Sequence, residues 1–542
     1  MAATASRSDE GVLKSMGYAQ SLYRGLNSFA SFAFNFTSVG VLTSLSVGFA
    51  SSMASGGPAV ILWGWVICSC FTVCTAIALA EIAAVYPTAG SVYHWAAFMA
   101  PHRHSALLAY IAGTFNLLGN AAGTASFAWG FASFVASLRS LDAWVDGVGV
   151  EAAAAEAAAL TTGQTVGVAV AVCTAWALVN LLHVTWQGHI NSFAALWQLF
   201  STIAIVVVVL AQPNTQPDAD PALPLFWPWY TTFNNTGFDS NQWFGYVMLL
   251  GLLNSLFGFA GYEAGAHLSE ETKNASKSTA WGIVLCSVVT ALFGFVYVVG
   301  LCYATPRAIM MPYPAWVAAG GQATDDDAFA APGDLSTGAY LRHAMYLVSE
   351  NGAVFLYFAA AGRAAGRALG IVLVLNVLFA GVSALTVTAR VAYAMARDGA
   401  LPLSGAITSL LPATLAPVGA VVFTYLLSVA LLLIGLGTTQ GLYAVLSICV
   451  IGYQISYCIP ILLRVFASGA DFVAHPSFSL GRLSLPLHAV AGLWLVFSSM
   501  IFFWPSRWPL QLVGQTTAEG VVGVDDDNFN YTVRSTSPCP FC

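Results

Sequence analysis

The chain has 542 residues, of which 58% are hydrophobic and only 8% are charged. Soluble domains carry roughly 25% charged residues, so this composition excludes a soluble protein and indicates an integral membrane protein. No basic cluster in this chain of net charge -7 suggests a nucleic-acid partner, and the ten cysteines show no metal or disulfide spacing.

Hydropathy predicts about eleven membrane-spanning helices, because one span needs about 20 apolar residues. A short helix over Val354–Ala368 is expected to precede the eighth span. Residues 1–28 are polar and lack the features of a cleavable signal, so we expect them to form a cytoplasmic tail. The expected spans are 29–52, 59–83, 104–138, 164–183, 190–211, 243–265, 279–303, 370–396, 416–437, 441–463 and 483–504.

Lys and Arg in short loops set the orientation of a membrane protein. With the N-terminus in the cytosol, most of the 17 basic residues, including Lys273 and Lys277, fall on the cytoplasmic side. The glycosylation sequon Asn234-Asn235-Thr236 then falls in an outer loop, in agreement with this orientation.

Two apolar spans are interrupted by small and polar residues. Phe257–Thr272 (FGFAGYEAGAHLSEET) carries glycines and a carboxylate at the end of the sixth span, and Ser38–Ser44 (SVGVLTS) interrupts the first. Unwound backbone groups cannot be satisfied by lipid, so they must face a polar cavity or a bound solute. Glycines also let helices pack closely, but two such segments five spans apart favour the substrate site of a secondary transporter.

Four polar residues within the spans are candidates for a role in the site. Glu263 is interpreted as a proton-coupling group, as a partner for a substrate amine, or as a structural carboxylate bonded to backbone. Asn116 and Asn120, one turn apart in the third span, either line the site or form interhelical hydrogen bonds. Glu81, at the cytoplasmic end of the second span, favours a structural or gating role.

Several short motifs occur in one order along nearly the whole chain. They are GGP at 56–58, WGW at 63–65, AEIAAVYPTAGSVYHWAA at 80–97, GYE at 261–263, HLSEET at 267–272, ARDGALP at 396–402, IP at 459–460 and GR at 481–482. Each motif is weak by itself. The ordered set resembles the amino acid–polyamine–organocation (APC) superfamily, specifically its amino acid/GABA/choline permease branch of fungal GABA and choline permeases and plant bidirectional amino acid permeases.

The resemblance implies an all-α polytopic transporter fold with a five-plus-five inverted repeat and broken helices 1 and 6. Its repeats would cover 29–211 and 243–463 within a transporter domain over 29–504, with the eleventh span at 483–504. Pro87 and Gly90 would lie in a gating or structural re-entrant turn after the second span. The implied substrate contacts are Ser38, Gly40, Thr43 and Ser44 in span 1 and Phe259, Ala260, Gly261, Tyr262 and Glu263 in span 6.

The chain departs from the family pattern in three places. Glu263 stands where relatives often carry Asp, and the fifth span, Ile190–Leu210, lacks the Lys that replaces a sodium ion in some bacterial relatives. The family has a twelfth span, whereas the tail over 505–542 ends in RSTSPCPFC after Val533. We expect this ending to be a truncated gene model.

These observations predict a secondary active transporter that moves amino acids or related amines such as GABA, choline or polyamines by alternating access. A bundle of spans 1, 2, 6 and 7 would rock against a scaffold of spans 3, 4, 8 and 9. No cofactor is expected, and proton coupling is a candidate; the plasma membrane and an internal (vacuolar or organellar) membrane both stay open, as does the oligomeric state. The rival interpretations are a nutrient sensor on the same fold and a membrane enzyme, although no Gly-x-Ser-x-Gly or His-Glu-x-x-His motif occurs.

Overall fold

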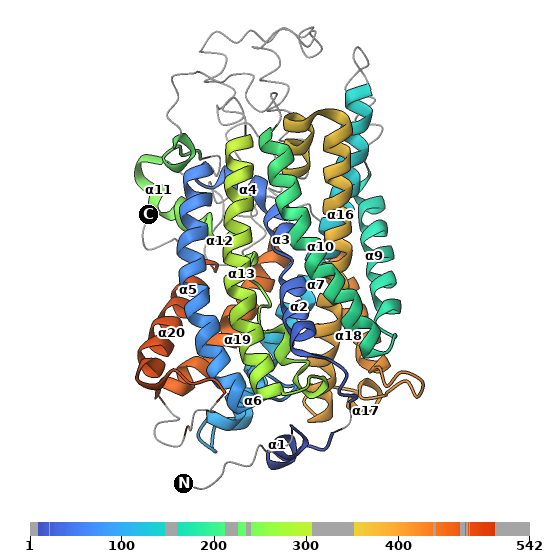
Figure 1. Ribbon diagram of the computed structural model, residues 1–542, viewed down its shortest axis with the longest axis vertical. Coiled ribbons are helices and arrows are strands. Elements are labelled where there is room, and N and C mark those ends of the chain that lie inside the picture. The colour runs from blue at the N-terminus through green and yellow to red at the C-terminus, as the bar shows by residue number, and fades with distance from the viewer. Residues whose placement is uncertain are drawn as a thin grey trace, which may run out of the picture.

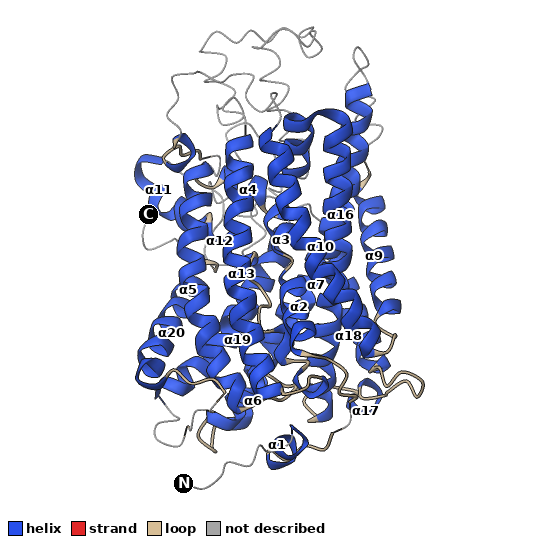
Figure 2. Cartoon of the chain, viewed as in Figure 1, coloured by secondary structure: helices blue, strands red, loops and turns tan. Residues whose placement is uncertain are grey.

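The structure is a computed structural model that describes residues 9–20, 22–146, 160–211, 226–234, 240–305, 352–436, 441–466, 472, 475 and 477–503. In these ranges the elements are α-helices and short 3-10 helices, with no strand beyond two isolated bridges (Figure 2). Residues 1–8 of the expected cytoplasmic tail, most of the sequon and the whole C-terminal tail over 505–542 lie outside the described residues.

The long helices run side by side along the long axis of the molecule (Figure 1). The short helix α1 (Asp9–Ser15) lies at one end, which we call the α1 face. The first five spans are α2 (Ser28–Val39) with α3 (Val41–Val47) and α4 (Phe49–Ala54), then α5 (Gly57–Val85), α7 (Ser105–Asp146), α9 (Thr162–Val179) and α10 (Val184–Ala211). The short α6 (Val92–Met99) connects α5 to α7 near the α1 face.

The second half of the chain repeats the pattern of a broken span followed by long helices. It comprises α11 (Ser240–Leu250) with α12 (Leu252–Phe257), the 3-10 turns η3 (Ala264–Ala266) and η4 (Ser269–Glu271), then α13 (Ala275–Ala304), α16 (Gly352–Arg397), α18 (Val418–Ile434), α19 (Gly441–Phe466) and α20 (Ser484–Ile501). Among the described residues, nine helices are long and apolar enough to cross a membrane. Two shorter apolar helices, Gln242–Phe257 and Val418–Ile434, match the sixth and ninth expected spans.

Several expected boundaries differ from those of the structure. The fifth span begins at Val184 rather than 190, and the α-helix of the sixth span ends at Phe257 rather than 265. The short helix expected over Val354–Ala368 is present as the first part of α16, which joins the eighth span across a kink at Gly362, so this helix ends near Gly362 rather than at Ala368. Hydropathy misplaces these ends because it senses neither backbone breaks nor polar residues that extend a helix beyond its apolar stretch.

Helix α5 packs closely along α13, and Trp65 of α5 takes part in that contact. Its indole N–H donates to the Ala291 carbonyl at 3.0 Å, and its ring stacks on Phe259 with centroids 4.7 Å apart. A Cβ at Gly294 would overlap the Trp65 ring, so glycine is required where the two helices meet. Helix α16 packs along α7 in the same way, and α9 and α18 contact this second pair.

Candidate substrate site

The first span is broken at a single residue. Gly40 has φ 51° and ψ 54°, the left-handed conformation that ends α2 and lets α3 begin at Val41. A Cβ at Gly40 would lie 3.0 Å from the Cβ of Ala380 on α16. The conformation and the close approach both require glycine, so the predicted interruption of span 1 is confirmed as a notch in the helix.

The sixth span is broken over a longer stretch. Helix α12 ends at Phe257, and the chain up to Asn274 contains only the two short 3-10 turns η3 and η4. Gly261 has φ 85°, and a Cβ there would lie 3.1 Å from the Tyr453 hydroxyl and 3.6 Å from the Ser38 Oγ. The two interruptions therefore approach each other, with α19 beside them.

A small cavity lies between the two interruptions. Its walls come from spans 1, 3, 6, 8 and 10, and none of the lining residues is Asp, Glu, Lys, Arg or His. We call it the central cavity. It is lined by Ser38, Asn120, Gly123, Phe127, Phe257, Ala260, Ala384, Cys449 and Tyr453.

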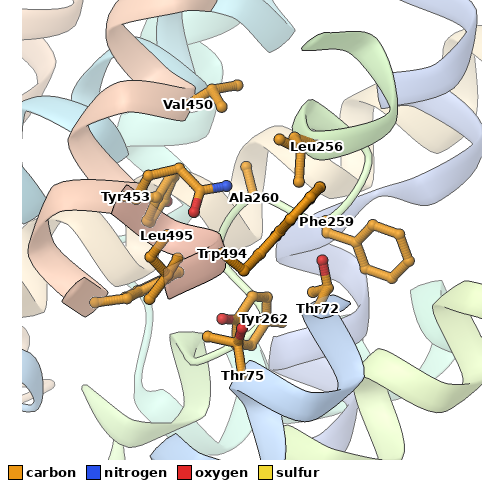
Figure 3. Close-up of a pocket in the computed structure, with 12 residues that line it drawn as sticks. Thr72, Thr75, Leu256, Phe259, Ala260, Tyr262, Val450, Tyr453, Trp494 and Leu495 are labelled. Carbon is orange, nitrogen blue, oxygen red and sulfur yellow. The ribbon is translucent and has the colours of Figure 1, made fainter. Parts of the chain in front are cut away.

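A second small cavity lies on the other side of the unwound segment, between α5, α19 and α20. Figure 3 shows Phe259, Ala260 and Tyr262 of the unwound segment gathered around it with Thr72 of α5. Ala260 and Tyr453 line both cavities. The unwound segment and α19 thus form the wall that separates the two cavities.

A chain of hydrogen bonds leads from the central cavity to Glu263. The Tyr453 hydroxyl donates to Asn120 Oδ1 at 2.8 Å, and the Asn120 amide donates to Asn116 Oδ1 at 3.1 Å. The Asn116 amide then donates to Glu263 Oε1 at 3.1 Å, while Tyr457 donates to Oε2. Glu263 is fully buried and is not among the cavity-lining residues, so this chain is what links it to the cavity.

Ion pairs join the unwound segment to α16 on the α1 side of the cavity. Arg390 Nε lies 2.9 Å from Glu271 Oε1, and both side chains are almost completely buried. Arg397 contacts both oxygens of Glu270 at 2.9 and 3.0 Å, in the bidentate geometry that gives strong, oriented pairs. The Ala89 N–H donates to Glu270 Oε1 at 3.0 Å, so the turn after α5 belongs to the same group of contacts, which we call the α1-side seal.

Asp398, directly after α16, gathers hydrogen bonds from the N-terminal segment and α6. Its Oδ2 accepts from Tyr93 at 2.9 Å and Tyr18 at 3.3 Å, and His94 Nε2 lies 2.8 Å away. Burial by itself would raise the pKa of Asp398, but the hydrogen bonds and charge of its neighbours, His94 foremost, hold that pKa below its usual value. The carboxylate therefore stays ionised and fastens the N-terminal segment to the α1 face.

The opposite end of the cavity region is closed by neutral groups. The Ser46 and Tyr297 hydroxyls lie 2.6 Å apart, and the Tyr297 and Tyr357 hydroxyls lie 2.5 Å apart. These contacts join span 1 and α13 to the start of α16. The central cavity is thus bounded on one side by ion pairs and on the other by a chain of three hydroxyls.

Comparison with known proteins identifies the family. A family model described as amino acid permease matches residues 26–517. The chain belongs to the amino acid permease family. Amino-acid permease BAT1 of Arabidopsis thaliana is 31% identical over 499 residues, which cover 92% of this chain and 89% of that protein. The BAT1 homolog of Oryza sativa is 30% identical over 92% of this chain and 88% of its own length. An uncharacterized amino-acid permease of Schizosaccharomyces pombe is 27% identical over 93% and 84%.

Family membership confirms several expectations from the sequence. The permease is a multi-pass membrane protein with an all-α fold of the APC type, and it is a transporter rather than an enzyme. Its substrate class is amino acids, and its environment is the lipid bilayer. The broken helices 1 and 6 expected for that fold are present at Gly40 and from Gly258 onwards.

The predicted substrate contacts of the permease fall into three groups. Ser38, Asn120 and Ala260 line the central cavity. Phe259 and Tyr262 line only the second cavity, and both are labelled in Figure 3. The remainder lie behind the walls: Gly40 and Gly261 shape the breaks, Thr43 and Ser44 are buried in α3, and Asn116 and Glu263 belong to the hydrogen-bond chain.

The three residues of the permease expected to gate or support the fold lie nearer the α1 face. Glu81 accepts the Leu480 N–H at 2.9 Å and the Ser484 hydroxyl at 2.5 Å, so it ties α5 to the start of α20. Pro87 and Gly90 lie in the turn between α5 and α6. A Cβ at Gly90 would lie 2.5 Å from the His94 ring, so this turn needs glycine to pack on α6.

The sequence-based prediction missed the contribution of the tenth span. Cys449 and Tyr453 line the central cavity, and Tyr457 bonds Glu263. Helix α19 has no glycine break, which was the signal used to find the other two walls. Its available signal was weaker: Tyr453 and Tyr457 are spaced i and i+4, so their polar tips lie on one face of an apolar helix.

Proposed function

We propose that the permease transports small zwitterionic amino acids, including γ-amino acids such as GABA, through the central cavity. The observation that carries this proposal is the neutral lining of that cavity. A net cation such as choline or a polyamine would enter a buried space with no counter-charge, which costs several kcal/mol. A zwitterion carries both charges and finds partners in the backbone groups of broken helices.

Side chains from the two halves of the proposed moving assembly meet at this cavity. Ser38 and Ala260 belong to spans 1 and 6, which we assign to the mobile bundle with α5 and α13. Asn120 and Ala384 belong to α7 and α16, which we assign to the scaffold with α9 and α18. A rocking motion between these halves would open the cavity, so alternating access follows naturally from its position.

The two seals fit this mechanism because each joins bundle to scaffold. On the α1 side, Glu271 of the bundle pairs with Arg390 of the scaffold. On the opposite side, Ser46 and Tyr297 of the bundle reach Tyr357 of α16. The structure thus corresponds to an occluded state in our proposal, and the positive-inside pattern makes the α1 face cytoplasmic.

Transport by the purified permease in proteoliposomes tests the proposal. Labelled alanine, GABA, choline and putrescine are offered separately, with protein-free liposomes as the blank. We expect saturable uptake of alanine or GABA and no uptake of choline or putrescine above the blank. Uptake of a cation alone would contradict the neutral-cavity argument, and uptake of none of the four would favour the sensor interpretation over transport of small zwitterions.

A further inference from the structure

A buried imidazole faces the buried carboxylate of Glu263. The Nδ1 of His267 lies 3.0 Å from the Ala89 carbonyl oxygen, which can only accept a hydrogen bond. Nδ1 therefore carries a proton. The other ring nitrogen, Nε2, lies 3.6 Å from Glu263 Oε1 and has no hydrogen-bond partner. The protonation of Nε2 thus depends on the carboxylate in front of it.

The charge of Glu263 is not balanced by its other neighbours. Its two oxygens accept from the Asn116 amide and the Tyr457 hydroxyl, which are both neutral donors. Among the ion pairs of the described residues, the one that includes Glu263 is with His267. Both side chains are 1% exposed or less. A buried carboxylate without a counter-charge costs several kcal/mol, and here it would also face the Nε2 lone pair.

One proton removes this conflict in either of two positions. Bound at Nε2, it makes an imidazolium that pairs with the carboxylate; bound at Glu263, it makes a neutral acid that can donate toward Nε2. We propose that Glu263 and His267 together hold one exchangeable proton and that its uptake and release couple amino-acid transport to the proton gradient. This inference rests on the proposed transport function and names the coupling ion that family membership leaves open.

The partners of the pair lie on parts that move apart in the proposed mechanism. Glu263 and His267 belong to the unwound segment of the bundle, whereas Asn116 lies on α7 of the scaffold. Separation of bundle and scaffold would remove the Asn116 hydrogen bond and let water reach the carboxylate. The proton affinity of the pair would then change with each half-cycle, which is the requirement for coupling.

The substrate can sense the state of the pair through the hydrogen-bond chain. Tyr453 and Asn120 line the central cavity, and Asn120 is linked through Asn116 to Glu263. A solute that takes the Tyr453 bond to Asn120 would reorganise the chain that ends at the carboxylate. Tyr457 provides a second link, because it contacts Glu263 and also lines the second cavity.

Among the described residues, the other ionisable groups that face Glu263 are of a different chemical type. The titratable neighbours are hydroxyls and thiols whose ordinary pKa values are above 8, while an ordinary carboxyl or imidazole titrates below 7. Farther along the segment, Glu270 and Glu271 are already paired with Arg397 and Arg390. The neighbours are Tyr262 on the unwound segment, Cys286 on α13, and Cys449, Tyr453 and Tyr457 on α19.

The test imposes a proton gradient, acid outside, on proteoliposomes that contain the wild-type permease and measures accumulation of a labelled amino acid. We expect the gradient to raise accumulation about tenfold and the amino acid to draw protons inward, detected by an external pH dye. Wild-type exchange without either response would overturn the proposal. Failure of all amino-acid transport would instead contradict the proposed function, so the two failures are distinguishable.

Variants of the pair separate proton binding from a structural role. In Glu263→Gln and His267→Asn the hydrogen-bonding shape is kept but the titrating group is lost, since the Asn amide can still donate to Ala89. We expect both to exchange amino acids more slowly than the wild type and to show no response to the gradient in that exchange, and Glu263→Asp to keep a reduced response. A full gradient response in a folded Glu263→Gln protein would overturn the assignment. If that variant does not fold, the pH-dye measurement on the wild-type permease decides whether transport is coupled to protons.

A second buried Glu–His pair supplies the matched control. Glu81 lies 3.9 Å from His488, and both side chains are as buried as the first pair. Its carboxylate already accepts the Leu480 N–H and the Ser484 hydroxyl, and it lines neither cavity. We expect Glu81→Gln to lower stability while the gradient response survives. Loss of the response in this variant as well would show that any buried Glu–His pair has the same effect, which would overturn the assignment to Glu263.

Discussion

The two broken spans differ in how the chain continues after the break. Span 1 returns to α-helix at once, since Gly40 is left-handed and α3 begins at Val41. Span 6 does not return to α-helix before α13 begins at Ala275, and the intervening chain carries Glu263 and His267 as well as the acids of η4. The first break is a notch in a helix, whereas the second is an irregular segment loaded with titratable groups.

Hydrogen bonding explains why the difference matters. The hydroxyls of span 1 make contacts with neutral groups only: Thr37 donates to the Ala33 carbonyl at 2.7 Å and also contacts Asn191 Oδ1 on α10 at 2.7 Å. Ser44 donates to the Val39 carbonyl at 2.7 Å, and Ser46 contacts Tyr297. The acidic side chains of η4 instead pair with charged groups on α16, as Glu271 does with Arg390. Changes in span 1 should therefore disturb neutral contacts, whereas changes in span 6 should also disturb buried charges.

The largest effect is expected from the buried ion pair of the span 6 segment. Arg390→Met leaves Glu271 buried without its counter-charge, and breaking such a pair costs about 3–5 kcal/mol. We expect a large fall in the thermal stability of the detergent-solubilised protein, measured by the fraction that stays monodisperse after heating. The matched double variant, Arg390→Met with Glu271→Met, should recover most of that loss. Equal losses in the single and double variants would show that the charge imbalance is not the cause.

The next largest effect is expected at Gly261. In Gly261→Val a β-branched side chain meets a left-handed φ of 85° and the Tyr453 hydroxyl, which lies 3.1 Å from the first added carbon. We expect this variant to reach the membrane but to lose amino-acid uptake, because the wall between the two cavities is displaced. Uptake is measured in cells or proteoliposomes and normalised to the amount of protein.

Gly481 offers a control, because it has a left-handed backbone conformation like that of Gly261 but free space around an added side chain. Its φ is 55°, and nothing lies within 4 Å of an added Cβ. Gly481→Val should therefore share the conformational strain but keep its uptake. If both valine variants lost uptake equally, strain alone would account for the effect and the position of Gly261 at the cavity wall would be irrelevant. Near-normal uptake by Gly261→Val would remove the support for the site itself.

The sequence was sufficient to predict both breaks and their order. Glycines and hydroxyls inside the apolar stretches at Gly40 and Gly261 signal that the helix cannot be continuous, and this inference needs no tertiary contact. Glu263 was singled out for the same reason, because a carboxylate in a span is costly. The asymmetry of the breaks was not predictable, since it depends on partners such as Tyr457 and Arg390, which lie far along the chain.

The contribution of α19 shows where sequence reasoning fails for this fold. Tyr453 is 6% exposed and Cys449 is fully buried, so both resemble ordinary core residues of an apolar helix. Only the packing of α19 against α7 and the unwound segment turns that face toward the cavity. A pattern within one helix predicts which residues share a face, but it does not predict which neighbour that face meets.

The smallest effect is expected from the notch in span 1. Gly40→Ala places a Cβ 3.0 Å from the Cβ of Ala380 and forces alanine into a φ of 51°, which costs about 1–2 kcal/mol. Because the neighbouring hydroxyls contact neutral groups only, this strain leaves no buried charge without its partner. We expect a modest loss of thermal stability and retained uptake with a normal response to an imposed proton gradient. Loss of uptake as complete as in Gly261→Val would place the two breaks on an equal footing, and the distinction between a geometric notch and a chemically active segment would then be wrong.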